Sequence, residues 1–400
     1  MSESKLKMCQ ECRGLIAADA AVCPLCGAQA HRAGGGTTAV AGALTVTGII
    51  FTLNLIFYAL SLLLTTRLRE RGSGFTFSPN GFANYLLGSA QRGAIAQGQY
   101  WRLVTYAFLH GDVLHILFNS LALLQAGRLA EEAFGRAKFI CVYLVSAICG
   151  GLAVFLSGGG LVGASGAIFG LIGATAVYGY KRRDSYGQAL KSAMVQWLIY
   201  GAVISFLPGI SWQGHLLGLL GGAGMAWFLS GADESAQSYQ RAKIWQMAAG
   251  LSWLLIIASF VLMALGLRAT METVRIQLLS DHVFQTAFDL KRWNGLNRDE
   301  SVQDYSGILG ASVTSLEMAA TVDAESEAIK QRMLAATRAL REQLKQHRDS
   351  SVPPPDQSQM AAYQQAFDDY YAWLKGRAAS LGIRVEELHP DWTLHQNQPQ

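Results

Sequence analysis

Charged side chains are scarce in this 400-residue sequence, of which only 15% is Asp, Glu, Lys or Arg while 51% is hydrophobic. An average soluble protein has about 25% charged residues, so the composition excludes an ordinary soluble enzyme. The scarcity is uneven: residues 1–32 carry 7 charged side chains, residues 33–267 carry 21, and residues 268–400 carry 32. The sequence therefore predicts a membrane block between two water-compatible ends. The net charge of +4 is small and indicates no nucleic-acid partner.

Long stretches of the middle segment lack charge altogether. They are residues 33–66, 139–180, 192–232 and 244–267. A membrane crossing needs roughly 20 apolar helical residues, and the second and third stretches are long enough for two crossings each, with breaks at 158–160 and at Pro208-Gly209. A weaker span completes a set of seven predicted helices at 38–64, 103–127, 139–156, 163–180, 192–207, 213–230 and 245–267.

These features predict an all-α polytopic membrane protein with five parts. The parts are a zinc ribbon at 1–32, a linker at 33–37, a six-span core at 38–230, a loop with a seventh span at 231–267, and a soluble, mostly helical tail at 268–400. A cleaved signal peptide is not expected, because the first apolar run begins after residue 32 and is too long for one.

Basic residues set the expected orientation. With a cytoplasmic N-terminus, three loops on the cytoplasmic side carry Arg128, Arg136, Lys138, Lys181, Arg182, Arg183, Lys191, Arg241 and Lys243. This distribution satisfies the positive-inside rule, with Arg67, Arg69 and Arg71 as the exception. We therefore expect a plasma (inner) membrane protein whose tail lies outside the cytoplasm, after an odd number of spans.

Four cysteines are arranged as two close pairs, Cys9-x2-Cys12 and Cys23-x2-Cys26. Two such pairs match the ligand spacing of a tetrahedral zinc site. The alternative, a pair of disulfides, would require an oxidising compartment, whereas this end is expected in the cytosol. The segment resembles small zinc ribbons, and four cysteine ligands would make the zinc structural.

Polar residues inside the apolar spans are costly, and they are therefore functional candidates. They are His110, His115, Asn119, Ser165 and His215. Taken singly, a serine among glycines is more often a packing residue, and a membrane histidine often only bonds a carbonyl. The combination is more specific, because Ser165 and His215 lie at matching depth on two helices.

Two stripes of small residues predict that these two helices touch. They are Gly166 with Gly170 in the fourth span, and Gly218 with Gly222 in the sixth. Small residues four apart let helix backbones approach closely. We expect this approach to bring the serine and histidine together.

With these residues the sequence resembles the rhomboid intramembrane serine proteases, over roughly residues 40–230. The resemblance rests on Trp101-Arg102, His110, His115-x3-Asn119, Gly163-Ala164-Ser165-Gly166 and His215-x2-Gly218-x3-Gly222. It implies that Ser165 is the nucleophile and His215 the general base. It also implies that His115, Asn119 and the backbone N–H of Ser165 serve the oxyanion.

Other positions follow from the same resemblance. Trp101 and Arg102 belong to a membrane-embedded loop, and Phe169 takes the place of an aromatic that packs on the catalytic histidine. The family often has alanine before that histidine, where this sequence has Gly214. No Asp or Glu lies in the spans of Ser165 or His215, so the expected machinery is a dyad that needs no catalytic cofactor.

Three functions remain open from the sequence. The first is a serine protease that cleaves single-span membrane proteins in the bilayer. The second is a catalytically silent rhomboid-like protein that binds membrane clients, and the third is a transporter or scaffold with a zinc-ribbon binding module.

Helices at 316–349 and 358–381 are expected in the tail, where they or the ribbon could bind a protein partner. The first carries an apolar stripe of Val322, Ile329, Met333, Ala336, Leu340 and Leu344.

Overall fold

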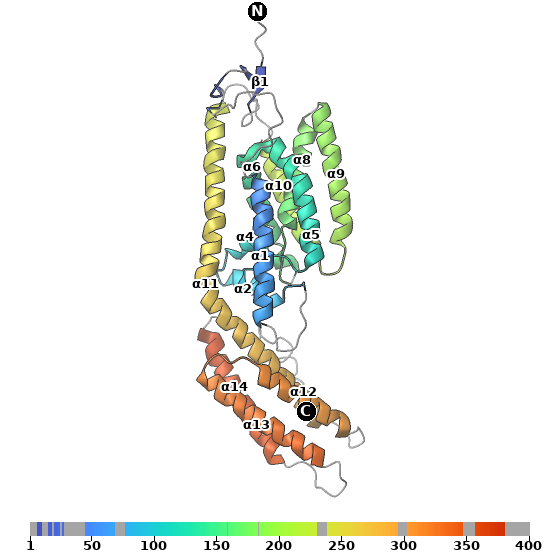
Figure 1. The fold of residues 1–400 in the computed structure, drawn as a ribbon, viewed down its shortest axis with the longest axis vertical. Helices are drawn as coiled ribbons and strands as arrows, with labels where there is room; N and C mark the ends of the chain where they lie inside the picture. Colours follow the sequence, from blue (N-terminus) through green and yellow to red (C-terminus); the bar gives the residue numbers. More distant parts are fainter. Residues whose placement is uncertain are drawn as a thin grey trace, which may run out of the picture. The chain divides into compact units, whose positions relative to one another are not determined.

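The computed structural model is helical throughout most of its length (Figure 1). It describes residues 6–9, 15–17, 20–24, 26–27, 45–68, 77–157, 159–182, 184–229, 238–294, 302–346 and 357–380. The chain divides into two compact units. The first comprises Met1–Arg69 and Gly74–Leu265, and the second comprises Glu70–Ser73 and Gly266–Gln400.

The N-terminal segment contains a small antiparallel hairpin. Strand β1 (Leu6–Met8) pairs with β2 (Leu15–Ala17), with Lys7 opposite Ile16. Ile16 is buried in one small cluster with Cys9, Cys23 and Cys26. A segment this small buries too little apolar surface to be stable by itself, and a bound structural metal is one way to stabilise such a hairpin.

Long helices fill the rest of the first unit. They are α1 (Val46–Leu68), α5 (Val113–Ala122) continuing through η2 (Leu123–Gly127) into α6 (Arg128–Gly151), α8 (Ser165–Lys181), α9 (Ser185–Ser205), α10 (Trp212–Leu229) and the first part of α11 (Ser238–Asn294), which belongs to the second unit from Gly266 on. Shorter helices are α2 (Gly81–Leu86), α3 (Arg92–Ala96), α4 (Arg102–Thr105), η1 (Tyr106–Phe108) and α7 (Val154–Ser157). Among the described residues, three stretches are long and apolar enough to cross a membrane: Val46–Thr66, Val113–Ser157 and Ala242–Leu290. The expected helical membrane fold is confirmed.

The second and third predicted spans differ from expectation at their boundaries. The second was expected from 103, but residues 102–108 form short helices and α5 begins only at Val113, where the Asp112 carboxylate accepts a hydrogen bond from the His115 N–H. This N-cap starts the helix ten residues late. No separate loop divides the second predicted span from the third. The helix is interrupted there at Gly135 alone, whose φ of 74° is not helical. The first span was expected from 38, and residues 38–44 lie outside the described part.

A glutamate fixes the start of α1. The Glu131 carboxylate accepts hydrogen bonds from the Val46 and Thr47 N–H groups at 2.9 Å and from the Thr47 hydroxyl at 2.6 Å. These N–H groups have no acceptor within the helix, and a negative charge there is favoured by the helix dipole. The beginnings of α1 and α6 are thereby held together.

The second unit consists of packed helices. After the end of α11 come α12 (Val302–Met318), α13 (Ala324–Gln346) and α14 (Gln357–Ser380). With the second part of α11 they share a core that contains Leu279, Val283, Leu309, Leu316, Met333, Leu340, Tyr370 and Leu374. The prediction of a helix at 358–381 is confirmed within one residue.

The prediction of one helix over 316–349 was wrong at its beginning. Residues 319–323 form a break between α12 and α13, and Val322 lies in it. Asp323 explains the break, because its carboxylate caps α13 by accepting a hydrogen bond from the Ser326 N–H at 2.8 Å. The apolar stripe otherwise packs as expected at Ile329, Met333, Ala336 and Leu340, while the Leu344 side chain lies outside the described residues.

We expect Asp323→Ala to loosen α13 and α14. Besides capping α13, the carboxylate accepts a hydrogen bond from the Trp373 indole of α14 at 3.2 Å. Loss of an N-cap typically costs about 0.5–2 kcal/mol. Hydrogen exchange of full-length protein should show faster exchange over residues 324–346 and 357–380, whereas Asp368→Ala, at an exposed surface position, should leave both unchanged. Equal exchange in the two variants would contradict this role.

Acid should weaken the hydrogen bonds that the Asp323 carboxylate accepts from Ser326 and Trp373. Partial burial raises the pKa of Asp323, but hydrogen bonds from Ser326 and Trp373 outweigh it and leave the pKa below its ordinary value. A lowered folded-state pKa contributes stability above the unfolded pKa of about 3.9, and this stability is lost as the pH falls through the folded value. Protection of α13 in hydrogen exchange should therefore decline below about pH 4 in the wild type, and less in Asp323→Ala.

Candidate active site

Glycines let α8 and α10 pack with their backbones in contact. A Cβ atom at Gly218 would overlap the carbonyl oxygen of Gly166, and one at Gly222 would overlap that of Gly170. The close approach expected from the two stripes is therefore present. It is extended to α6, because a Cβ atom at Gly150 would lie 3.1 Å from the Gly214 carbonyl oxygen.

This packing brings Ser165 and His215 together. The Ser165 Oγ lies 2.9 Å from the His215 Nε2. Ser165 is the first residue of α8, after the glycine-rich turn, and His215 lies one turn into α10. The histidine is buried at 7% exposure, while the serine is partly exposed, so the hydroxyl is the accessible member of the pair.

Two other side chains hold the His215 ring. The Phe169 ring is stacked on it, with centroids 4.3 Å apart and planes inclined by 11°. The Nδ1 atom lies 2.6 Å from the Oγ of Ser205, near the end of α9. The contact with Phe169 was expected, but that with Ser205 was not.

His115 approaches the dyad through Gly163. A Cβ atom at Gly163 would lie 2.6 Å from the His115 Nε2 and 3.6 Å from the Ser165 Oγ, so this glycine leaves the space between them open. Its φ of 127° also requires glycine. The Gly111 N–H donates to the His115 Nδ1 at 3.4 Å. Neutral His115 then carries its proton on Nε2, the nitrogen toward Gly163.

Asn119 and His110 complete the polar group of this region. Asn119 lies one turn after His115 on α5, is 6% exposed, and its side-chain nitrogen has no hydrogen-bond partner among the described residues. His110 is fully buried, and its ring packs against that of His115 with centroids 5.1 Å apart. A buried amide donor without a protein acceptor is available to a ligand.

Arg102 ties the preceding loop together instead of facing the dyad. Its guanidinium is buried and donates to the carbonyl oxygens of Tyr85 and Ser89 at 2.9 Å and to Gln99 at 2.7 Å. It also lies over the Tyr85 ring. Trp101 is the N-cap residue of the short helix α4, which begins at Arg102. These contacts give Arg102 an architectural role in the segment that precedes the second span.

Tyr106 is a further structural residue that the sequence did not single out. Its hydroxyl donates to the Ala147 carbonyl oxygen at 2.7 Å, and it lies where Gly150 and Gly166 meet. Nothing in the sequence distinguishes this tyrosine from other apolar-span aromatics. Its role depends on the junction of helices that are distant in sequence.

The geometry suits nucleophilic chemistry. A serine hydroxyl needs a base within hydrogen-bond reach, and His215 is at that distance. The first N–H groups of α8, including that of Ser165, have no acceptor within the helix. Donors that meet a reacting oxygen in a site of low dielectric stabilise negative charge strongly.

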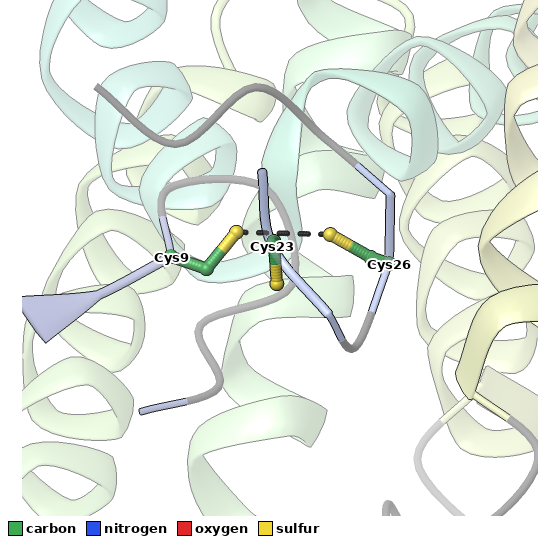
Figure 2. Close-up of side chains that lie close together, drawn as sticks. All are labelled: Cys9, Cys23 and Cys26. Atoms are coloured by element: carbon green, nitrogen blue, oxygen red, sulfur yellow. Dashed lines mark hydrogen bonds between the residues drawn. The ribbon is translucent and has the colours of Figure 1, made fainter. Parts of the chain in front are cut away.

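A separate cluster of cysteines lies in the N-terminal segment (Figure 2). The sulfurs of Cys9, Cys23 and Cys26 all lie within 4.8 Å of one another, and the side chains are buried. The Cys9 and Cys26 sulfurs are 3.7 Å apart, close to the ~3.8 Å between thiolates that sit ~2.3 Å from one tetrahedral zinc. Three of the four expected ligands thus converge on a space that fits a metal, and Cys12 lies outside the described residues.

Comparison with known proteins places the helical bundle in a family. Residues 97–232 match the family model of the rhomboid domain. The rhomboid protease GluP of Bacillus subtilis is 33% identical over 173 residues, which cover 43% of this chain and 33% of GluP. Rhomboid-like protease 3 of Toxoplasma gondii is 29% identical over 195 residues, covering 46% and 72% of the two chains. RHOMBOID-like protein 5 of Arabidopsis thaliana is 32% identical over 142 residues, covering 34% and 46%.

The fold and these similarities define a helical membrane protein with a rhomboid domain. The chain belongs to the rhomboid family. It spans only a third of the length of GluP. The matched segment contains Ser165 and His215, whereas the cysteine cluster and the second unit lie outside it.

Proposed function

We propose that the protein is an intramembrane serine protease that cleaves transmembrane segments of single-span membrane proteins. The observation that carries the proposal is the 2.9 Å contact between the Ser165 Oγ and the His215 Nε2, at the start of two helices in close backbone contact. Ser165 would attack the scissile carbonyl while His215 takes its proton. Protonated His215 would then give this proton to the nitrogen of the leaving amine as the C–N bond breaks, which leaves the acyl-enzyme. Water would hydrolyse the acyl-enzyme, with His215 again acting as base.

In this proposal three donors meet the oxyanion. They are the backbone N–H of Ser165, the Nε2–H of His115 and the side-chain amide of Asn119. The tautomer of His115 supports its role as a donor. Because the Gly111 N–H donates to Nδ1, the proton of the neutral ring is on Nε2. Asn119 is supported by its buried nitrogen, which lacks an acceptor among the described residues.

The proposed setting is the plasma membrane, with the N-terminus in the cytoplasm and the residues after 268 outside it. The support is the basic-residue bias of the loops. Ser165 and His215 each follow a loop on the opposite side from the basic loops, so the dyad would lie toward the outer surface. Water for deacylation would enter from that side.

Proteolysis in lipid vesicles tests the function. Purified protein should cleave a reporter containing one transmembrane helix, and mass spectrometry should place the cut within or next to the apolar segment. A soluble reporter with the same flanking residues but no apolar segment is the matched control. Binding of the membrane reporter without any cleavage would instead support the catalytically silent client-binding protein.

We expect Asn119→Ala to give a slow but detectable enzyme. Removing one oxyanion donor typically costs about 100-fold to 1000-fold in kcat. Turnover of the single-span reporter should fall by this factor, while thermal unfolding shows that the bundle remains folded. A folded Asn119→Ala variant as inactive as Ser165→Ala would contradict the assigned role.

We further propose that the N-terminal segment binds one structural zinc through Cys9, Cys12, Cys23 and Cys26. The support is the sulfur cluster of three of these residues and the spacing of the fourth. Four thiolates would leave no open position on the metal. The zinc would therefore hold the ribbon together and take no part in proteolysis.

We expect stoichiometric zinc in reduced, purified protein. Metal analysis should give one zinc per chain, and Cys23→Ser should lose it, since a ligand in a closed four-coordinate site is missing. Cys149→Ser, at a cysteine of the helical bundle, is the control and should keep the metal. Deletion of residues 1–32 should leave the proteolytic rate of the core unchanged. Reduced protein without zinc would overturn the assignment.

A further inference from the structure

Ser205 is the polar side chain that contacts the Nδ1 of His215, and among the described residues no carboxylate hydrogen-bonds to this ring. Its Oγ lies 2.6 Å from the His215 Nδ1 and 2.7 Å from the Gly201 carbonyl oxygen, one turn earlier on α9. The side chain is 7% exposed. The serine thus faces the nitrogen of His215 opposite to the one that contacts Ser165.

We propose that Ser205 is a positioning residue that selects the reactive tautomer of His215. A serine has one hydroxyl proton and two acceptor lone pairs. If the proton is donated to the Gly201 carbonyl, Ser205 accepts the Nδ1–H of His215, and both contacts are hydrogen bonds. If the hydroxyl instead donates to Nδ1, the bond to Gly201 is lost. The tautomer with a proton on Nδ1 therefore keeps more hydrogen bonds.

This tautomer leaves Nε2 unprotonated and 2.9 Å from the Ser165 Oγ. Nε2 can then accept the Ser165 proton, as a general base must. Once it does, the ring is positively charged, and its Nδ1–H bond to Ser205 becomes the stronger, charge-assisted kind. Ser205 would thus support the ring before and during proton transfer without touching the substrate.

The same turn of α9 also holds the ring by packing. A Cβ atom at Gly201 would overlap the tip of the Phe169 ring, and Phe169 is stacked on His215. Gly201 and Ser205 are four residues apart and share one helix face. This turn therefore fixes both the plane of the imidazole, through Phe169, and its rotation and tautomer, through Ser205.

The inference rests on the proposed protease function, and two independent measurements test it. The first is turnover of the single-span reporter by Ser205→Ala, Ser205→Thr and the control Ser61→Ala. Ser61, like Ser205, is a buried helical serine that donates to the carbonyl four residues earlier, but it lies on α1. We expect Ser205→Ala to lower kcat on the order of tenfold to a hundredfold with little change in KM, as for a lost hydrogen bond to a developing charge. Ser205→Thr should restore most of the rate, and Ser61→Ala should match the wild type.

The second measurement is nitrogen NMR of ¹⁵N-histidine-labelled protein in lipid, with His215→Gln to identify the signals among eight histidines. The wild type should show a protonated Nδ1 and a bare Nε2, and Ser205→Ala should gain the opposite tautomer. Unchanged kcat in Ser205→Ala, or an Nδ1–H tautomer that persists without Ser205, would overturn the inference. If the wild type cleaved nothing, the protease function would fail, while the NMR result would still decide the role of Ser205.

Discussion

Ser165→Ala is expected to abolish cleavage of a single-span reporter and covalent labelling by a fluorophosphonate probe. The Ser165 hydroxyl lies 2.9 Å from His215 and opens the helix whose free N–H groups would meet the oxyanion. Removal of a nucleophile of this kind typically costs several orders of magnitude in kcat. Because alanine fits the site without new contacts, thermal unfolding should be nearly unchanged.

His215→Ala should be almost as inactive, since Ser165 would then lack a positioned base. Ser61→Ala serves as the matched serine control, because it removes a buried hydroxyl far from the dyad in sequence and on a helix that does not carry it. Proteolysis or probe labelling that survived in Ser165→Ala would show that another nucleophile acts, and the assigned site would be wrong.

The sequence predicts the membrane block well because the signal is strong. Uncharged runs of more than 20 residues have few stable alternatives to membrane helices. Boundaries depend on single residues and were less accurate. Asp112 delays the start of α5, Gly135 breaks the helix between the second and third spans, and Asp323 begins α13 after a turn. Each is a local cap or break that an apolar pattern does not contain.

The core of the candidate site could be predicted from the sequence because polar groups in an apolar span are rare and conspicuous. Ser165, His215, His115 and Asn119 are groups of this kind. Ser205 is not conspicuous in the same way, since a serine in a membrane helix usually bonds the carbonyl four residues before it, as Ser205 also does. Its second contact depends on how α9 and α10 meet, and no spacing within either helix reveals it.

Gly218→Ala is expected to damage both stability and catalysis. The added Cβ atom would overlap the carbonyl oxygen of Gly166 and would have to push α10 away from α8. Overpacking of this kind typically costs about 1–3 kcal/mol. Gly218 lies one turn after His215, and Gly166 follows Ser165 directly, so the separation acts on the dyad itself. A shift of about 1 Å can cost on the order of 100-fold in rate.

Gly224→Ala is the matched control for this change. Gly224 lies on the same helix, and a Cβ atom there meets nothing within 4 Å. Alanine in an exposed helix position is favoured over glycine by roughly 0.5–1 kcal/mol, so this variant should be as stable as the wild type or slightly more stable, with the same kcat. Thermal unfolding in detergent and reporter turnover should therefore both show a loss in Gly218→Ala and no loss in Gly224→Ala. Equal behaviour would mean that the backbone contact between α8 and α10 does not hold Ser165 against His215.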